Sequence, residues 1–346
     1  MKAVAYSVKP FEKEFLAKAN QKKHDITLIS NDLNPETAVY AAGKDVVIVL
    51  NDDVDAAQVK RLANFGVKYI AARSIGVSQI DSAAAANHHI KIADAPFYPP
   101  QSIAELAVGL ALALGRNIAT AKEKSARFDF RNEDLLGFNF CGKTVGIIGL
   151  GKIGQAVANI FAGMGCNIIA YDPAFPADAG NVTEVDLETL FLLSDVISLH
   201  VPLTADSNHF INRKAFEQMK KGVMLINTSN GELINTKDAV IALENGKLGF
   251  LGIDVYEHEK GLFFEDHEND KEKDPLLARL IDYPNVLVTP HQAYLTRESI
   301  QSIAYQIINH LDQWQVEQRN ESALINAKNT DPEKLKEPSK QISHAN

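Results

Sequence analysis

The segment from Thr144 to Ala158, TVGIIGLGKIGQAVA, constrains the fold of this chain more than any other. A strand-like apolar run leads into glycines at positions 149, 151 and 154, and a helix-compatible run follows. The pattern G-x-G-x-x-G is a weak signal alone, but between a strand and a helix it is typical of a dinucleotide-binding turn. Gly149 permits the tight turn, Gly151 lets the backbone approach a pyrophosphate, and Gly154 lets the helix pack close to the strand. The segment predicts a nucleotide-binding βαβ unit.

The residues after this turn favour NAD as the nucleotide. Lys152 and Ile153 begin the predicted helix, whose N-terminus offers free N–H groups and a positive dipole to phosphate. Asp172 follows the next strand, where a carboxylate accepts hydrogen bonds from the adenosine ribose hydroxyls. That carboxylate would repel the 2′-phosphate of NADP, and residues 173–175 offer no basic side chain. A tight turn without a ligand is the less favoured interpretation.

Strand-like apolar runs, each followed by a helix-like stretch, recur along the chain. They are Ala3–Tyr6, Ile26–Ile29, Val46–Leu50, Tyr69–Ala72, Thr144–Gly149, Asn167–Tyr171, Val196–His200, Val223–Asn227, Gly249–Asp254 and Val286–Thr289. This alternation predicts an α/β fold, with parallel sheets covered by helices. The 346 residues suggest two domains, at about 150 residues per domain. With 46% hydrophobic and 23% charged residues, the composition is that of a globular protein and excludes a disordered chain.

A long helical segment, Ser102–Lys124, lies between the two sets of strands. Small and aliphatic side chains occupy almost every face of it before it turns charged. A helix that is apolar all round must be buried on all sides. We expect this helix to link the two sheets and to pack against a second subunit, so that the protein is a homodimer.

The charge balance excludes several kinds of partner. The chain has 35 basic and 44 acidic residues, a formal net charge of -9, whereas nucleic acids and anionic membranes favour basic surfaces. No apolar run approaches the roughly 20 residues of a membrane span, and the N-terminus lacks a secretory signal pattern. We therefore expect a cytoplasmic protein with no nucleic-acid or membrane partner. Residues 331–346 are polar and are expected to form a flexible tail.

Three later segments, each after a predicted strand, carry candidate reacting groups. They are Leu225–Gly231, Gly252–Glu259 and Val288–Tyr294. His291 could be an ordinary structural histidine, but beside a nicotinamide an imidazole that titrates near neutrality is the proton donor that carbonyl reduction requires. Glu257 or Glu259 could hold its other ring nitrogen, and the spacing does not choose between them. No group of histidines has metal-ligand spacing, so no metal site is expected.

Together these motifs resemble the D-specific 2-hydroxyacid dehydrogenases, and among them most the fermentative NAD-dependent D-lactate dehydrogenases. The resemblance covers nearly the whole chain. It rests on Arg73–Val77, Tyr98, the glycine turn, Ser198–Thr204, Gly252–Glu257 and Pro290–His291. The run Glu259–Asp266, EKGLFFED, points to the lactate branch. The resemblance implies an oxidoreductase that moves hydride reversibly between NADH and pyruvate or a related 2-keto acid.

The resemblance also implies roles for matched residues in the chemistry and in cofactor binding. His291 would donate and accept the proton, Glu259 would be its carboxylate partner, and Asp254 would help to fix the site near the nicotinamide. Five residues would flank the cofactor on its nicotinamide side: Val201, Pro202, Ser207, Thr228 and Ser229.

For the substrate, the resemblance implies that backbone N–H groups around Ile75, Gly76 and Val77 bind the carboxylate and that Tyr98 lines the pocket. It implies two doubly wound domains: a Rossmann-type NAD domain at 101–295, and a flavodoxin-like, split substrate domain. The latter would comprise residues 1–100 and 296–330, closed by a C-terminal helix such as Thr296–Gln318.

Asn230 departs from the family pattern at a position that matters for catalysis. The family motif N-T-S-R-G has an arginine that grips the substrate carboxylate and polarises the carbonyl, whereas this chain reads NTSNG over residues 227–231. Asparagine donates neutral hydrogen bonds but lacks the charge and the fork of a guanidinium. Loss of such a contact costs about 2 to 5 kcal/mol, which lowers kcat/KM for a keto acid by roughly 30-fold to several thousand-fold. Smaller departures are Pro99, usually Ser, and Tyr294, often Phe, which we expect to contact the substrate.

Three interpretations of Asn230 remain open. The protein is a dehydrogenase of the D-lactate type whose arginine has been replaced, leaving NAD binding and weak turnover. Alternatively, Asn230 and Tyr294 retune the pocket to another 2-keto or 2-hydroxy acid. In the third interpretation, the protein is an NAD-binding regulator that has lost turnover, but the presence of His291, Glu259 and Asp254 together argues against it.

Overall fold

The computed structural model describes residues 1–96 and 99–329, with side chains up to residue 320. Tyr98, expected in the substrate pocket, and the tail expected at 331–346 lie outside the described residues. The chain divides into two compact units. The first comprises Met1–Tyr98 and Ile300–Asn346, and the second comprises Pro99–Ser299.

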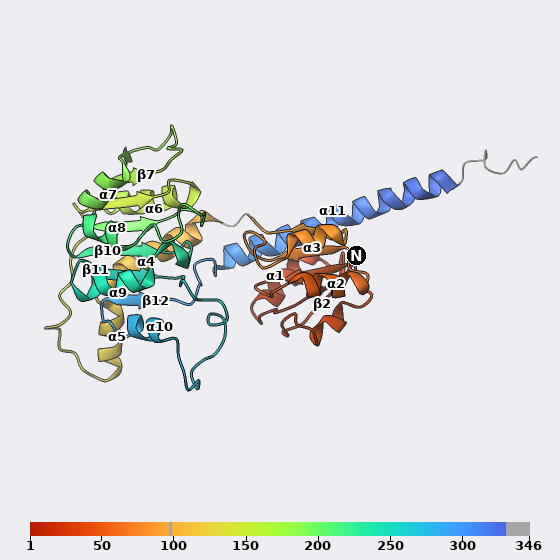
Figure 1. Cartoon of the computed structure of the whole chain (residues 1–346), viewed down its shortest axis with the longest axis horizontal. Coiled ribbons are helices and arrows are strands. Elements are labelled where there is room, and N and C mark those ends of the chain that lie inside the picture. The colour runs from red at the N-terminus through yellow and green to blue at the C-terminus, as the bar shows by residue number, and fades with distance from the viewer. Residues whose placement is uncertain (97–98, 330–346) are drawn as a thin grey trace, which may run out of the picture. The chain divides into compact units, whose positions relative to one another are not determined.

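The first unit contains a five-stranded parallel sheet (Figure 1). Its strands are β1 (Lys2–Ala5), β2 (Asp25–Leu28), β3 (Val46–Val49), β4 (Tyr69–Ala72) and β5 (Lys91–Ala93), in the order β2-β1-β3-β4-β5. Its helices are α1 (Glu12–Asn20), the 3-10 helix η1 (Thr37–Ala41), α2 (Ala56–Asn64), α3 (Ser82–Asn87) and α11 (Arg297–Asn329). The order is the flavodoxin-like one, as the family resemblance implied.

Burial explains why the central strands of this sheet have no polar face. Every side chain of β3 and β4 is buried, which is expected where helices cover both faces of a parallel sheet. The C-terminal helix α11 supplies part of that cover. Its Trp314 stacks on Tyr69 of β4, with ring centroids 4.7 Å apart.

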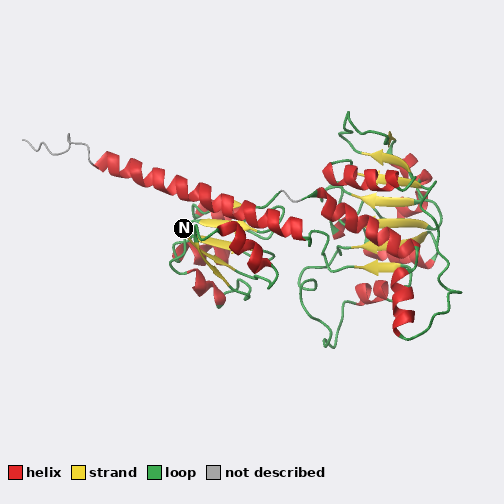
Figure 2. Ribbon diagram, turned by 180° about the vertical axis from the view of Figure 1, so that it is seen from behind, coloured by secondary structure: helices red, strands yellow, loops and turns green. Residues whose placement is uncertain are grey.

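The second unit contains a seven-stranded parallel sheet (Figure 2). Its strands are β6 (Thr144–Ile148), β7 (Asn167–Tyr171), β8 (Thr183–Glu184), β9 (Val196–Leu199), β10 (Val223–Asn227), β11 (Leu248–Ile253) and β12 (Val286–Val288). The spatial order is β12-β11-β10-β9-β6-β7-β8. The chain therefore runs outward from β6 to β8 and then returns to the other side of β6 at β9, which is the doubly wound, Rossmann-type arrangement.

Helices cover both faces of this second sheet, and each face has its own apolar core (Figures 1 and 2). One face carries α4 (Pro100–Gly115) and α6 (Lys152–Gly163). The other carries α7 (Leu187–Leu193), α8 (Arg213–Gln218), α9 (Thr236–Glu244) and α10 (Pro275–Ile281). The α/β prediction is confirmed.

The single helix predicted over Ser102–Lys124 is wrong in one respect. It consists of α4 and α5 (Ile118–Ala126), which meet at an angle of 64°. Asn117 adopts a left-handed conformation, with φ of 52°, at the break, and Asn is among the residues that tolerate this conformation. A methyl group at Gly115 would lie 2.8 Å from the Phe140 ring, so close packing also selects glycine where α4 ends.

The sequence pattern did not predict two short edge strands, β5 and β8. They have three and two residues, too few for an alternation of apolar and polar side chains to be recognised.

Among the described residues, no single helix has the length and apolarity to cross a membrane, and only the bent pair α4 and α5 meets those two criteria jointly.

The first unit also depends on a buried ion pair. Arg73, at the end of β4, is 1% exposed and pairs with Glu12 of α1, while its Nη2 donates to the Tyr6 carbonyl at 2.5 Å. Because Arg73 directly precedes residues 74–77, this pair ties the start of that loop to α1 and to the end of β1.

We predict that Arg73→Met destabilises this unit by about 3 to 5 kcal/mol, because it leaves the Glu12 carboxylate buried without its partner. The double variant Arg73→Met/Glu12→Leu should recover most of that loss. The chain has one tryptophan, Trp314, which lies in this unit, so urea unfolding followed by tryptophan fluorescence measures the effect directly. An equal loss in the double variant would contradict the assignment.

Candidate active site

Several sequence-predicted residues meet at one edge of the second sheet. All strands of that sheet are parallel, so their carboxyl ends lie together. The glycine turn follows β6, Val201 follows β9, Thr228 follows β10, Asp254 follows β11 and His291 follows β12. In such sheets ligands bind at the carboxyl edge where the strand order reverses, which here is between β6 and β9.

The glycine turn has the geometry of a phosphate-binding turn. Gly149 has φ of 91°, and a methyl group there would lie 2.4 Å from the His200 carbonyl oxygen. A methyl group at Gly154 would lie 2.0 Å from the Gly149 carbonyl oxygen. Nothing lies within 4 Å of the corresponding position at Gly151, which leaves the backbone open to a ligand. The three glycines therefore fit the roles expected of them, and the residues present fit a dinucleotide.

Lys152, Ile153 and Asp172 complete this half of the site. Lys152 and Ile153 form the first turn of α6, whose N-terminal N–H groups lack partners inside the helix. The Asp172 carboxylate accepts from the backbone N–H groups of Leu150, at 2.6 Å, and Ala174, at 2.8 Å. A carboxylate has about four acceptor positions, so Asp172 keeps capacity for ribose hydroxyls.

The nicotinamide-side residues predicted at the ends of β9 and β10 are held by local hydrogen bonds. The Ser207 hydroxyl donates to the Pro202 carbonyl at 2.8 Å, and the Ser229 hydroxyl donates to the Leu199 carbonyl at 3.0 Å. The Thr228 hydroxyl oxygen is buried and has no partner among the described residues. Because buried polar groups are normally satisfied, this hydroxyl is a hydrogen-bonding group available to a ligand.

His200 is a buried residue at this edge that the sequence analysis did not identify as a site residue. Its Nε2 lies 2.8 Å from the Ser198 hydroxyl, and its Nδ1 has no partner within the described part of the chain. Burial lowers the pKa of His200 to about 3, so it is neutral at physiological pH. The sequence offered no signal for it, because a histidine at the end of a fully buried strand such as β9 has no distinguishing pattern.

The His291 imidazole contacts Glu259 and not Glu257. Its Nδ1 lies 2.8 Å from Glu259 Oε1, and the other Glu259 oxygen accepts from the Tyr256 backbone N–H at 3.0 Å. Nε2 is then the nitrogen left to face a reactant. Glu257 instead pairs with His209 Nε2 at 2.7 Å. Sequence spacing left open whether Glu257 or Glu259 holds the His291 ring, and in the structure Glu259 is the one in contact with it.

Asp254 anchors the turn that carries His291. It is fully buried, and its carboxylate accepts from the Thr289 hydroxyl at 2.5 Å and from the backbone N–H groups of Gln292 and Ala293 at 2.9 and 2.8 Å. Its carbonyl accepts from the His291 N–H at 2.8 Å. Burial raises the pKa of Asp254, against the opposing effect of these hydrogen bonds. A part for Asp254 in binding the nicotinamide stays a prediction.

The two carboxylates determine how His291 titrates. Burial lowers the pKa of His291, but the hydrogen bond and charge of Glu259 and the charge of Asp254 raise it by more, so the net pKa lies above the usual value. An imidazole in this setting keeps its proton to a higher pH than a free one. The pair can therefore donate a proton near neutrality and take it back in the reverse reaction.

Asn230 is held at the end of β10 by its backbone. Its carbonyl accepts from the side chain of Asn227 at 2.7 Å, and a methyl group at Gly231 would lie 2.1 Å from the Tyr256 carbonyl carbon. The hydrogen bonds between described residues do not include the Asn230 side chain. The amide is therefore available to a ligand, but it brings no positive charge.

In the first unit, the loop around Gly76 differs from the expectation. The Gly76 N–H, at φ of 76°, donates to Asp94 Oδ2 at 2.9 Å, so this donor is engaged inside the unit. That Gly76 offers its N–H to a substrate carboxylate stays a prediction, and it requires this hydrogen bond to Asp94 to be released or shared. The N–H groups of Ile75 and Val77 make no hydrogen bond with other described residues.

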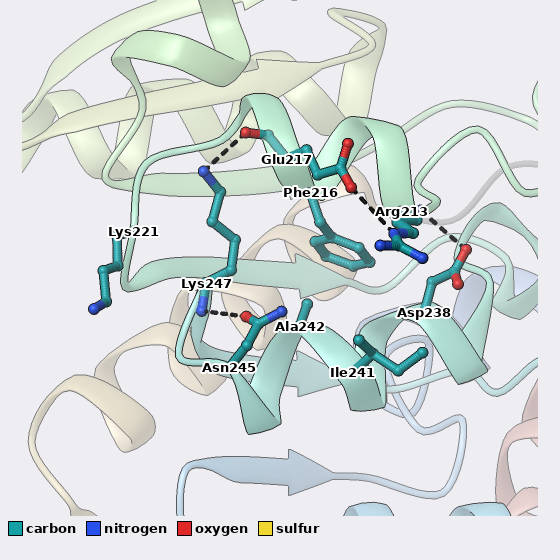
Figure 3. A pocket seen from close by; sticks show the side chains of 9 residues that line it. All are labelled: Arg213, Phe216, Glu217, Lys221, Asp238, Ile241, Ala242, Asn245 and Lys247. Carbon is teal, nitrogen blue, oxygen red and sulfur yellow. Dashed lines mark hydrogen bonds and ion pairs between the residues drawn. The ribbon is translucent and has the colours of Figure 1, made fainter.

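The surface hollow drawn in Figure 3 is separate from these residues. It has a volume of about 400 Å³ and lies between α8 and α9. Two of its basic groups are partnered locally: Arg213 Nε lies 3.1 Å from Glu217 Oε1, and Lys247 Nζ donates to the Glu217 carbonyl at 2.9 Å. None of its lining residues belongs to the predicted site.

Comparisons with known proteins agree with this geometry. Residues 108–293 match the family of the D-isomer specific 2-hydroxyacid dehydrogenase, NAD binding domain. The chain is 43% identical to a D-lactate dehydrogenase of Escherichia coli over 316 residues, which are 90% of this chain and 96% of that protein.

Solved structures agree as well. The pyruvate reductase of Chlamydomonas reinhardtii superposes with a TM-score of 0.89 at 38% identity, over 92% of this chain and 97% of that one. The D-lactate dehydrogenase with NAD+ from Lactobacillus jensenii superposes with a TM-score of 0.76 at 33% identity, over 90% and 97% of the two chains. This chain therefore belongs to the D-isomer specific 2-hydroxyacid dehydrogenases, NAD-dependent oxidoreductases that act on CH–OH groups.

Proposed function

We propose that this protein is an NAD-dependent dehydrogenase of the D-lactate type, which interconverts pyruvate, or a related 2-keto acid, and the D-2-hydroxy acid. The observation that carries the proposal is the His291–Glu259 pair at the carboxyl end of β12, in the same sheet whose strand β6 ends in the glycine turn. A proton relay and a dinucleotide site on one sheet edge are what a reversible hydride transfer to a carbonyl requires.

The reduction is a transfer of one hydride and one proton. NADH, held by the residues assigned below, would supply the hydride to the carbonyl carbon of the keto acid and become NAD+. As the carbonyl oxygen gains negative charge, His291 Nε2 donates its proton to it, and the alcohol forms. Glu259 holds the Nδ1 proton and stabilises the imidazolium before the transfer. In the reverse direction, neutral His291 accepts the hydroxyl proton.

For cofactor binding, we assign the pyrophosphate to the N–H groups at Gly151, Lys152 and Ile153, and the ribose hydroxyls to Asp172. The nicotinamide side is assigned to Val201, Pro202, Ser207, Thr228, Ser229 and Asp254. The unpartnered Thr228 hydroxyl and the open approach at Gly151 support these assignments. Residues 101–295 would form the NAD domain.

For substrate binding, we assign the carboxylate to the N–H groups of Ile75 and Val77 and to the Asn230 amide, with Tyr98 and Tyr294 as pocket residues. Gly76 would contribute its N–H only if the Asp94 carboxylate moves away. Residues 1–100 and 296–330 would form the substrate domain. The Tyr294 ring lies 6.5 Å from the His291 ring, edge to face, which supports a place near the reacting carbonyl.

Asn230 favours a second candidate, a dehydrogenase retuned to a different 2-keto acid. A neutral amide at this position weakens the grip on a carboxylate but accepts and donates hydrogen bonds to a polar substrate side chain. An NAD-binding regulator with little turnover is the remaining alternative. The intact His291–Glu259 pair speaks against it, because cofactor binding alone does not need a proton relay.

We further propose a homodimer in the cytoplasm. Four apolar side chains on α5 and the segment after it are exposed in the single chain: Ile118 at 54%, Phe128 at 86%, Phe130 at 73% and Leu136 at 92%. The Phe128 and Phe130 rings lie 6.0 Å apart, and exposed apolar side chains that lie close together are typical of a protein interface. The two cysteines, Cys141 and Cys166, are both free thiols, which is usual for a cytoplasmic enzyme.

We predict that His291→Ala lowers kcat for NADH oxidation with pyruvate by about 100-fold to 10,000-fold and leaves NADH affinity nearly unchanged. In the reducing direction, activity requires protonated His291, so it should fall as pH rises through the raised pKa of His291. Glu259→Gln removes the charge that raises this pKa, so the fall should occur at lower pH. Steady-state rates measured against pH give kcat and its pH dependence, and NADH fluorescence titration gives the affinity. Full activity of His291→Ala would refute the assignment.

We predict that Asn230→Arg raises kcat/KM for pyruvate by about tenfold or more, because it restores a charged, bidentate contact to the carboxylate. Asn230→Lys, which adds charge without the fork, should give a smaller gain. Both variants are compared with the parent chain in assays with NADH and a panel of 2-keto acids. A rate that is already high for another keto acid and falls on substitution would favour the retuned enzyme, and NADH binding without any oxidation would favour the regulator.

We predict that Phe128→Asp/Phe130→Asp converts a dimer into a monomer at micromolar concentration, since charge at the centre of an apolar interface is not tolerated. Light scattering measures the mass. Leu192→Asp, at a side chain that is 61% exposed on α7, is the matched control and should leave the dimer intact. A parent chain that is strictly monomeric would exclude the proposed assembly.

A further inference from the structure

Two residues in unusual backbone conformations meet at the proposed proton donor. Phe264 has φ of 72° and His291 has φ of 52°, both in the left-handed region. Their rings lie in a tilted arrangement, with centroids 5.6 Å apart and planes inclined by 39°. A left-handed backbone is costly for a bulky side chain and persists only where the surroundings enforce it. This contact is therefore a specific feature of the fold.

The segment that carries Phe264 is the same one that carries the His291 partner. The N–H groups of Leu262 and Phe263 both donate to the Glu259 carbonyl at 2.9 Å, so residues 259–263 form a tight turn. Phe263 points into the core, where its ring stacks near Tyr256 at 6.5 Å. With Phe263 anchored inward, the left-handed turn at the next residue places the Phe264 ring against His291.

The surroundings of His291 show what this ring can add. The titratable groups of the described residues that face His291 are Glu259 at Nδ1, Asp254 beneath its backbone and the Tyr294 ring at 6.5 Å. Phe264, itself 42% exposed, places its ring beside a His291 side chain that is 36% exposed. An aromatic ring within about 6 Å stabilises a cation, here the imidazolium.

We propose that Phe264 is a positioning residue for the reaction: its ring holds the protonated imidazole of His291 against Glu259 with Nε2 facing the substrate. This proposal rests on the proposed function, because it assumes that His291 is the proton donor. The contact that carries this role is the one between the Phe264 and His291 rings. Phe264 acts through His291, and nothing in the proposed assignment of the binding residues depends on it.

The test compares Phe264→Leu, which keeps apolar bulk without the aromatic face, with Phe264→Tyr, which keeps the face. Phe263→Leu is the control for general loosening of the same turn. The titration of His291 in the free protein is followed by NMR of its ring proton, with His291→Ala to assign the signal. We expect the pKa of His291 to fall by about 0.5 unit in Phe264→Leu and to stay near its parent value in Phe264→Tyr and Phe263→Leu. With pyruvate and NADH, Phe264→Leu should lower kcat severalfold, with KM for NADH unchanged.

The outcomes separate this proposal from the proposed function. An unchanged titration in Phe264→Leu, or an equal shift in Phe263→Leu, would overturn the role of Phe264 whatever the enzyme does. If the pKa of His291 falls in Phe264→Leu but kcat does not, the ring contacts His291 without positioning it. That result also overturns the proposal. If His291→Ala keeps full turnover, the proposed proton donor fails first, and that result is independent of every Phe264 variant.

Discussion

The candidate site depends on the buried carboxylate of Asp254. It accepts hydrogen bonds from the Thr289 hydroxyl and from the N–H groups of Gln292 and Ala293. These bonds fix the turn after β12 against the end of β11. This turn gives His291 its left-handed backbone and directs its ring to Glu259. Without an acceptor at Asp254, three donors would lose their partner together, and the imidazole would lose its direction as well.

The chain also shows how an acidic protein can hold an anionic cofactor. At a formal net charge of -9, it has no general attraction for phosphate. The glycine turn and the start of α6 supply backbone N–H groups and a helix dipole, which bind phosphate without a basic side chain. For the substrate carboxylate, the residue that we propose from the second unit, Asn230, offers a neutral amide and no positive charge.

Two aromatic side chains lie near the imidazole of His291, the proposed proton donor. The Phe264 and Tyr294 rings lie 5.6 and 6.5 Å from the His291 ring and come from different segments of the second unit. Tyr294 is three residues from His291 and was expected near it, whereas Phe264 could not be placed there from spacing, because α10 and β12 separate it from His291 in the sequence.

The sequence by itself determined the α/β class, the glycine turn with its NAD preference and the list of strand ends that carry polar groups, because these depend on local patterns of apolar and glycine residues. The tertiary structure alone decided which groups touch. It placed Glu259 on His291 and Glu257 on His209, broke the 102–124 helix at Asn117, and occupied the Gly76 N–H with Asp94. Each of these depends on where segments that are separate in the sequence meet in space. A linear pattern of residues does not contain the distances between such segments.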